Sequence, residues 1–307
     1  MTLAIKVDGL TKHYGQVQAV KGVSFSVQKG ALFAFLGTNG AGKSTTIEML
    51  CTLLDISSGE VIINGYTLGT SKGNQAIRQT IGIVFQQSLL DTELTVIENI
   101  MHRGKFYNLT KQQLKENYSF VCTYLHLDDI SHKKYGQLSG GQKRRADIAR
   151  AIIHKPQILF LDEPTTGLDP QTRKFVWQAI EKLRVDMNMT IFLTTHYMEE
   201  AAVADKIVVL KEGEIVAEGS PNELKLQYAS DQLLMTFKDD EQACEMAKSL
   251  GYAIEPHGDM YKLGLQSTVA AIPILNTLAP YLTSFEVIKG SLDQVFIQIN
   301  EEQREKS

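Results

Sequence analysis

The stretch that decides the fold is residues 37–45, which read Gly-Thr-Asn-Gly-Ala-Gly-Lys-Ser-Thr. It matches the pattern GxxxxGK(S/T), in which a glycine-rich turn wraps around phosphate groups. It follows an apolar run at residues 31–36 that predicts a buried strand. It also opens a segment with apolar residues at positions 47, 50, 51 and 54, the spacing of one helix face. A phosphate-binding loop requires this strand-to-helix context, so an ordinary glycine-rich turn is the weaker interpretation.

Each residue type in this loop has a chemical role toward a polyphosphate. The glycines permit the backbone to approach the phosphates closely, and the start of the helix adds partial positive charge. Lys43 brings a full charge to the β- and γ-phosphates, and the Ser44 hydroxyl can take one position on Mg²⁺. A polyphosphate and Mg²⁺ are therefore the expected ligands. The loop residues expected to bind them are Gly37, Thr38, Asn39, Gly40, Ala41, Gly42, Lys43, Ser44 and Thr45.

The composition indicates a globular protein whose main partner is not a long polyanion. Of the 307 residues, 43% are apolar, enough to bury one large core or two modest ones. Lys and Arg number 31 and Asp and Glu number 35, so the net charge of −4 disfavours nucleic acid. The three cysteines form no CxxC pair, which predicts no disulfide framework or thiolate metal site and favours a reducing cytoplasm. Without an 18-residue apolar run or a secretory signal, the chain is expected not to cross a membrane by itself.

Residues 1–228 are expected to form an α/β nucleotide-binding domain. Strand-like runs alternate with amphipathic segments, which predicts a mainly parallel sheet with helices on its faces. The expected core strands lie at residues 31–36, 81–85, 158–161, 190–194 and 206–210. The pairs Asn64-Gly65 and Glu212-Gly213 predict hairpin turns. Strand signals disappear between about residues 97 and 153, which predicts an inserted helical subdomain.

A composition shift after Pro221 separates a second, smaller α+β domain, expected at residues 229–300. Its pattern reads strand (233–237), helix (241–250), strand, turn and strand (252–265), helix (269–278), strand (284–288) and helix (292–299). This order resembles a ferredoxin-like βαββαβ unit with one added helix. Residues 301–307 carry five charges in seven residues and are expected to form a solvated tail.

Two carboxylates follow directly on a predicted buried strand. Residues 158–161 are apolar and run into Asp162 and Glu163, at the sheet edge where open α/β sheets bind ligands. An Asp at such a place can also simply cap a turn. With a phosphate loop upstream, Asp162 is the expected Mg²⁺ partner, directly or through water. Glu163 then has no obvious metal role, so it is the candidate to orient or deprotonate the attacking water, which predicts hydrolysis.

Residues 138–142 read Leu-Ser-Gly-Gly-Gln and precede a predicted helix. Ser139 is a good helix N-cap, although an N-cap alone does not need two glycines behind it. The buried side of the helix is expected to include Ala146, Ala149 and Ile153. Its cationic side chains are expected to point mostly outward into solvent and are assigned no nucleic acid. These are Lys143, Arg144, Arg145 and Arg150.

With these elements in order, residues 3–225 resemble the nucleotide-binding subunits of ATP-binding cassette (ABC) transporters. Seven motifs carry the resemblance, in the family's order. They are Tyr14, the loop at 37–45, Gln86, the signature of Ser139, Gly140, Gly141 and Gln142, the pair Asp162 and Glu163, the run Gly167-Leu168-Asp169, and His196. The implied fold is a P-loop core with an antiparallel β subdomain and an inserted helical subdomain. One departure is Thr38, where the family often has proline, and it costs the loop some rigidity but no ligand.

The resemblance also implies a role for each matched residue. Tyr14 would stack on the adenine ring, unless it is an ordinary core or surface tyrosine. Gln86 would reach Mg²⁺ or the attacking water, with Gln87 as the alternative if the register differs by one. His196 would hydrogen-bond the γ-phosphate, and Asp169 would contact an opposing subunit, although it is also an ordinary helix N-cap. The implied catalytic set is Glu163, His196, Gln86 and Lys43, and the implied Mg²⁺ set is Ser44, Gln86 and Asp162.

In the resembled family, two cassettes share each ATP. The signature of one copy, here Ser139 to Gln142, would cover the γ-phosphate held by the loop of the other copy. ATP would then join the two copies, and hydrolysis would release them. The implied partners are a second cassette, most simply an identical one, and a transmembrane permease. The permease would hold the chain at the cytoplasmic face of the membrane.

The C-terminal region favours one direction of transport. Residues 290–296 read Gly-Ser-Leu-Asp-Gln-Val-Phe and resemble the tail of bacterial drug-exporter cassettes of the daunorubicin-resistance type. A soluble ABC-type ATPase acting on the ribosome or on DNA is the alternative, disfavoured because each motif occurs once and no long coiled coil separates the loop from the signature. A regulator without turnover is opposed by the presence of both Glu163 and His196. Trp177, on the amphipathic segment after Pro170, is expected in the core.

Overall fold

The structure is a computed structural model that describes residues 2–239, 249 and 251–305. The chain divides into two compact units, Met1–Glu218 and Gly219–Ser307. This division falls before the expected boundary at residue 228, because α8 (Pro221–Tyr228) packs on α11 (Leu292–Glu305) within the second unit. Since α11 continues to Glu305, most of the expected solvated tail is helical.

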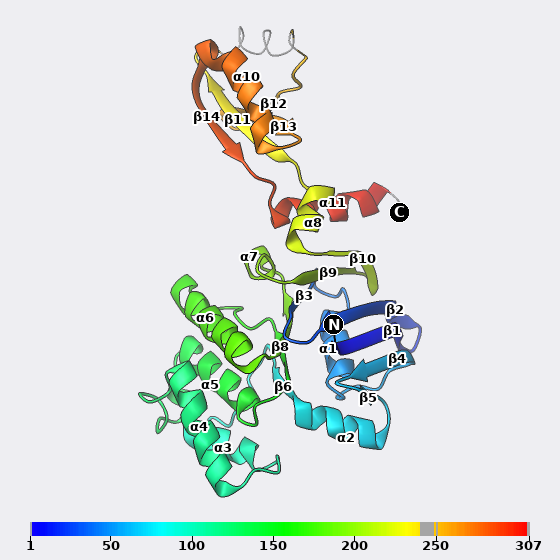
Figure 1. Cartoon of the computed structure of the whole chain (residues 1–307), viewed down its shortest axis with the longest axis vertical. Coiled ribbons are helices and arrows are strands. Elements are labelled where there is room, and N and C mark those ends of the chain that lie inside the picture. Colours follow the sequence, from blue (N-terminus) through cyan, green and yellow to red (C-terminus); the bar gives the residue numbers. More distant parts are fainter. Residues whose placement is uncertain (1, 240–248, 250, 306–307) are drawn as a thin grey trace. The chain divides into compact units, whose positions relative to one another are not determined.

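The core of the first unit is a six-stranded sheet (Figure 1). Its strands lie in the order β10 (Glu214–Gly219), β9 (Lys206–Lys211), β3 (Leu32–Gly37), β8 (Thr190–Thr195), β7 (Ile158–Asp162) and β6 (Ile81–Val84). The five strands from β9 to β6 pair in parallel, and every residue of β3 and β8 is buried. This confirms the parallel sheet predicted from the apolar runs. Parallel strands have their carboxyl ends at one edge, so the ends of β3, β7 and β8 meet there.

A second sheet of the first unit is antiparallel. It has the order β2-β1-β4-β5, formed by β1 (Leu3–Tyr14), β2 (Val17–Gln28), β4 (Ser58–Ile63) and β5 (Tyr66–Thr67). Asn64 and Gly65 both have positive φ, of 50° and 84°, as a two-residue hairpin turn requires. Glu212 and Gly213, with φ of 49° and 84°, form the same kind of turn between β9 and β10. Both predicted hairpins are therefore confirmed.

A cluster of phenylalanines joins the two sheets. Phe25 of β2 stacks on Phe33 of β3 with 5.3 Å between ring centroids, and Phe33 lies 5.0 Å from Phe192 of β8. Phe160 of β7 continues the cluster at 5.2 Å from Phe192. Each of these rings is buried, and burial of such a side chain contributes about 1.5–3 kcal/mol. The cluster therefore fixes β3, from whose end the phosphate loop departs.

The inserted helical subdomain occupies the chain between β6 and β7. It consists of α3 (Val96–Gly104), α4 (Lys111–Leu125), the 3₁₀ turn η1 (Tyr135–Gln137) and α5 (Gly140–Ile152). Each of the three α-helices begins with a capping box, in which the N-cap side chain and the third helical side chain bond each other's backbone. α6 (Pro170–Met187) follows β7 and packs with α4 and α5, as Figure 1 shows. The remaining helices of this unit are α1 (Lys43–Leu50), α2 (Ser71–Thr80) and α7 (Met198–Ala201).

The second unit contains an antiparallel sheet of order β12-β13-β11-β14. Its described elements, besides α8 and α11, are β11 (Asp231–Phe237), β12 (Glu255–His257), β13 (Met260–Leu265), η2 (Thr268–Ala270), α10 (Ala271–Leu278), η3 (Ala279–Tyr281) and β14 (Leu282–Ile288). This strand order is that of the predicted ferredoxin-like unit. The helix predicted at residues 241–250 lies outside the described residues, apart from residue 249. Neither unit, as far as it is described, contains a helix long and apolar enough to cross a membrane.

Candidate nucleotide-binding site

The phosphate loop connects β3 to α1, and two of its glycines are required for different reasons. Gly42 is the N-cap of α1 and has a φ of 100°, which L side chains rarely adopt. A Cβ atom at Gly37 would lie 2.4 Å from the backbone oxygen of Leu210 on β9. Gly37 therefore permits the close packing of loop and strand, and Gly42 permits the turn that directs the loop into the helix.

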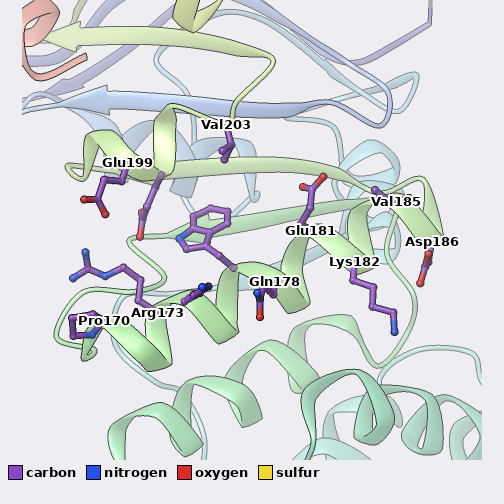
Figure 2. A pocket seen from close by; sticks show the side chains of 12 residues that line it. Pro170, Arg173, Gln178, Glu181, Lys182, Val185, Asp186, Glu199 and Val203 are labelled. Atoms are coloured by element: carbon purple, nitrogen blue, oxygen red, sulfur yellow. The ribbon is translucent and has the colours of Figure 1, made fainter. Parts of the chain in front are cut away.

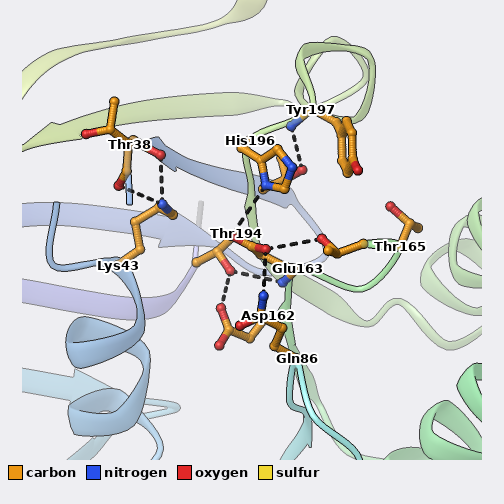
Figure 3. Close-up of polar contacts among 12 residues, drawn as sticks. Thr38, Lys43, Gln86, Asp162, Glu163, Thr165, Thr194, His196 and Tyr197 are labelled. Carbon is orange, nitrogen blue, oxygen red and sulfur yellow. Dashed lines mark hydrogen bonds and ion pairs between the residues drawn. The ribbon is translucent and has the colours of Figure 1, made fainter. Parts of the chain in front are cut away.

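The Lys43 ammonium is held inside this loop. Its Nζ donates hydrogen bonds to the backbone oxygens of Gly37, at 2.7 Å, and Thr38, at 3.0 Å (Figure 3). Burial lowers the pKa of Lys43, and the nearby carboxylates of Glu163 and Asp162 oppose that shift. The site therefore places one cation against two carboxylates at the carboxyl edge of the sheet. The ammonium attracts an anionic ligand, whereas the two carboxylates attract a cation.

Asp162 is the last residue of β7, and its carboxylate has a specific partner on the neighbouring strand. Thr194 of β8 donates its hydroxyl to Asp162 Oδ1 at 2.5 Å. Burial raises the pKa of Asp162, while the Thr194 hydrogen bond opposes the rise. Thr194 was not predicted as a site residue, although β7 and β8 are parallel and in register at Asp162 and Thr194. A hydroxyl at the paired position of an adjacent strand end is the signal that could have found it.

Three predicted site residues, Glu163, Gln86 and His196, come together at the Glu163 carboxylate. Gln86 Nε2 donates to Glu163 Oε2 at 3.1 Å, and His196 Nδ1 lies 3.4 Å from Glu163 Oε1 (Figure 3). The hydroxyl of Thr166 also donates to Oε2, at 3.1 Å. The sequence places Gln86 and His196 far from Glu163, and only the sheet edge brings the three side chains together. Gln86, and not Gln87, makes this contact.

The backbone of Glu163 is itself unusual. Its φ of 44° lies in the left-handed region, which costs a non-glycine residue about 1–2 kcal/mol. The Glu163 N–H donates to Thr194 at both the backbone oxygen, 3.1 Å away, and Oγ1, 3.2 Å away. Strain of this kind persists only where surrounding contacts hold it, and it concentrates at functional sites.

The signature residues form the exposed tip of α5. Ser139 is the N-cap of the helix, and its hydroxyl accepts from the Gln142 N–H at 3.4 Å. Gln142 Oε1 in turn accepts from the Ser139 N–H at 3.0 Å, so both side chains serve the cap within this chain. Ser139 and Gly140 are exposed. Among the described residues, no hydrogen bond or ion pair joins this tip to the Lys43 loop.

Two further predicted residues lie on the surface of the first unit. Tyr14, at the end of β1, is 49% exposed, so it is not a core tyrosine, and the Lys12 ammonium lies 5.3 Å from its ring centroid. Asp169 is the N-cap of α6 and accepts from the Thr172 N–H at 2.9 Å and from its hydroxyl at 2.6 Å. These bonds lower the pKa of Asp169. Both side chains are accessible to a ligand or a second chain.

Two predictions about side-chain orientation were wrong. Arg144 does not point into solvent: it is only 7% exposed, because its guanidinium bonds backbone oxygens beneath the site. Lys143, Arg145 and Arg150, which were also expected to point outward, are partly buried. Trp177 is only partly buried and lines a cavity of about 900 Å³ between α6 and α7, together with Val185 and Val203 (Figure 2). Amphipathic spacing identified the inner face of α6 but not the gap beside α7. The expected burial of Ala146, Ala149 and Ile153 is confirmed.

A glycine-rich loop before a helix, and paired carboxylates at the end of a parallel strand, together define a P-loop nucleotide hydrolase. Within this class, the chain belongs to the ABC transporter family. The sequence model of that family matches residues 20–166. It is 39% identical to the linearmycin resistance ATP-binding protein LnrL of Bacillus subtilis, over 75% of this chain and 73% of that protein. It is 35% identical to the daunorubicin/doxorubicin resistance ATP-binding protein DrrA of Streptomyces peucetius, over 97% and 92% of the respective chains.

The fold matches solved cassettes as well. A dimeric structure of the ATP-binding cassette MJ0796, bound to ADP and Pi in a post-hydrolysis state, aligns with a TM-score of 0.65 and 30% identity. The alignment covers 70% of this chain and 98% of that one. The family, the fold and the ATP-binding character predicted from the sequence are therefore confirmed.

Proposed function

We propose that this chain is the ATP-hydrolysing subunit of an ABC exporter, working as a pair of cassettes on a separate transmembrane permease. The observation that carries the proposal is the Glu163 carboxylate, held by Gln86, His196 and Thr166 beside the Lys43 loop. The names of the relatives support export, since LnrL and DrrA are described as resistance proteins. Attachment to the permease would place the chain at the cytoplasmic face of the membrane. A cassette acting on the ribosome is not favoured by these relatives.

The loop residues would hold the triphosphate. The backbone N–H groups from Gly37 to Thr45 offer donors around the phosphates, and Lys43 would exchange its two carbonyl partners for β- and γ-phosphate oxygens. The Tyr14 ring is exposed and free to stack on adenine. His196, which is partly exposed beside Glu163, would donate to the γ-phosphate.

The residues present fit a magnesium ion. Asp162 supplies a carboxylate, Ser44 a hydroxyl and Gln86 an amide oxygen, all hard oxygen donors of the kind that Mg²⁺ takes beside phosphates. Burial raises the pKa of Asp162, and a cation beside this carboxylate would favour its charged form. When bound, Mg²⁺ would neutralise charge on the β- and γ-phosphates.

Hydrolysis would then depend on Glu163. The carboxylate would accept a proton from the attacking water, and the Gln86 amide would orient that water. The contact between His196 and Glu163 keeps the γ-phosphate donor and the water-activating group within 3.4 Å of each other. The products would be ADP and phosphate.

The second cassette would complete each site. The tip formed by Ser139, Gly140 and Gly141 is a helix N-terminus, a natural anion site, and its first two residues are exposed. Since this tip makes no bond to its own Lys43 loop within the described residues, it would cover the γ-phosphate of the other copy. Asp169, exposed at the start of α6, would contact that copy. Loss of the γ-phosphate would then release the pair.

The test is Glu163→Gln, which keeps the size of the side chain and removes the proton acceptor. We expect MgATP binding to persist, kcat to fall by about 10²-fold or more, and an ATP-bound dimer to accumulate on a sizing column. Glu199→Gln, the same change at an exposed residue of α7, is the control and should leave kcat unchanged. Turnover of Glu163→Gln at the unmutated rate would refute the proposed role of Glu163.

A further inference from the structure

Arg144 is a buried cation of the signature helix, and its side chain reaches the strand ends of the site. It follows the N-cap Ser139 by five residues and is 7% exposed. Its guanidinium donates to the backbone oxygens of Glu163, at 3.0 Å, and Asp162, at 3.3 Å, and also to that of Pro164. A fourth bond, of 2.7 Å, runs to the Phe85 oxygen, immediately before Gln86. One side chain therefore binds both segments that carry the expected hydrolytic residues.

Guanidinium chemistry suits this position. Five N–H donors in a rigid planar fork can satisfy several carbonyls at once, whereas a lysine ammonium is a compact charge on a flexible stem. Burial lowers the pKa of Arg144, and Asp147 is the largest opposing influence, with its Oδ2 4.0 Å from Nη1. Asp147 also accepts from the Ser88 hydroxyl at 2.5 Å, which ties the segment after Gln86 to the same helix.

The strained backbone of Glu163 indicates the effect of the hydrogen bond from Arg144. Glu163 stays at a φ of 44° because its N–H donates to Thr194, and because its carbonyl accepts from Arg144 at 3.0 Å and from the Thr166 N–H at 3.4 Å. Without Arg144, that carbonyl would keep only the longer bond. The peptide between Glu163 and Pro164 could then relax toward a less strained conformation, and the carboxylate would turn with it. The Gln86 contact to that carboxylate depends on the same guanidinium through Phe85.

We infer that Arg144 is a positioning residue for hydrolysis, which holds the Glu163 carboxylate and the Gln86 segment of its own chain in register from the signature helix. The inference rests on the proposed function, because it gives Glu163 the water-activating role. It assigns Arg144 no contact with ATP. The helix whose tip would cover the ATP of the second copy thus carries, five residues later, the anchor of its own hydrolytic carboxylate.

The test substitutes Arg144 by lysine, which keeps the charge but not the fork. We expect kcat to fall by at least about tenfold, since a displacement of about 1 Å of a reacting group can cost about 10²-fold. The KM for ATP should stay unchanged, because Arg144 bonds no part of the Lys43 loop. Arg145→Lys is the matched control: Arg145 is adjacent, but its bonds go to the Leu125 and His126 oxygens in the helical subdomain, so kcat should stay unchanged. An unchanged kcat for Arg144→Lys, or a rise in KM as large as the fall in kcat, overturns the inference.

A mixed dimer provides a second measurement. Lys43→Ala removes the charged phosphate donor of one loop but leaves the tip and Arg144 of that chain intact. When Lys43→Ala chains are mixed with Arg144→Lys chains, the only intact loop belongs to the chain that lacks Arg144. We therefore expect no gain in ATPase activity over Arg144→Lys alone. A clear gain would mean that Arg144 serves the tip, and would overturn the inference.

The inference and the proposed function can fail separately. If Glu163→Gln hydrolyses ATP at the unmutated rate, the proposed function loses its catalytic residue. If Glu163→Gln is inactive while Arg144→Lys turns over normally, only the positioning role of Arg144 is refuted.

Discussion

Replacing Thr194 by valine removes one buried hydroxyl from the site and leaves the side-chain size almost unchanged. That hydroxyl donates to Asp162 Oδ1 at 2.5 Å and accepts from the Glu163 N–H at 3.2 Å. After the change, the Glu163 N–H keeps its bond to the Thr194 backbone oxygen, at 3.1 Å. The main loss is therefore the donor to the Asp162 carboxylate.

The magnitude follows from the charge on Asp162. A hydrogen bond to a charged group contributes about 1.5–3 kcal/mol, so the free energy of unfolding should fall by about 2 kcal/mol at neutral pH. For a unit of this size, Tm should then drop by about 4–8 °C. Thr190→Val is the matched control, because Thr190 lies on the same strand and its hydroxyl accepts from the uncharged Gly30 N–H at 3.0 Å.

The pH dependence distinguishes the two variants. Burial raises the pKa of Asp162 above its ordinary value of 3.8, so the folded chain binds this proton more tightly than the unfolded chain does. The free energy of unfolding therefore falls as pH rises from 3.8 through the folded pKa. Loss of the Thr194 hydroxyl raises the pKa of Asp162 in the folded chain further, so this variant should lose more stability toward neutral pH than in acid. The loss in Thr190→Val should not depend on pH.

The assay is thermal unfolding of the three proteins across the acid-to-neutral range, without nucleotide. If the curves for Thr194→Val and the unmutated chain run parallel at all pH values, the hydrogen bond does not influence the charge of Asp162, and the argument fails. The argument also fails if the loss of stability in Thr190→Val depends on pH as strongly as the loss in Thr194→Val.

Two further predictions test the loop and the signature. Lys43→Ala should weaken MgATP binding by at least about tenfold, because it removes the charged phosphate donor; equilibrium titration with a fluorescent ATP analogue measures this, and unchanged affinity would argue against a phosphate loop. Ser139→Arg should bind MgATP normally but fail to dimerise when combined with Glu163→Gln, because a bulky cation replaces the small tip. Sizing chromatography with ATP measures the dimer, and a normal dimer would contradict the shared site.

The local features of the site were predictable because each depends on neighbours in the sequence. The loop at residues 37–45 lies between a strand and a helix, and Asp162 is the last residue of a strand. An apolar run and the few residues that follow it define both positions. Capping boxes such as that of Ser139 and Gln142 are equally local. The parallel sheet followed from strand and helix alternation, and the ferredoxin-like order from the pattern after residue 229.

Arg144 shows what local sequence patterns cannot predict. A cation on a helix is usually solvated, so periodicity alone placed Arg144 outward, yet its carbonyl partners lie 18–20 and 59 residues away in the sequence. A signal was present: Arg144, Asp147 and Ile148 share the i, i+3, i+4 stripe that faces the core. A buried Asp beside a buried Arg indicates a polar contact network, but not which carbonyls it serves.

The sequence by itself predicted which residues would carry the chemistry, because motif spacing and strand ends are set by backbone conformation over a few residues. Only the tertiary structure decided how those residues are held. Thr194 meets Asp162 through strand register, and Arg144 meets Glu163 through the packing of α5 against the end of β7. Contacts between distant segments depend on the packing of the whole unit, so no local pattern fixes them.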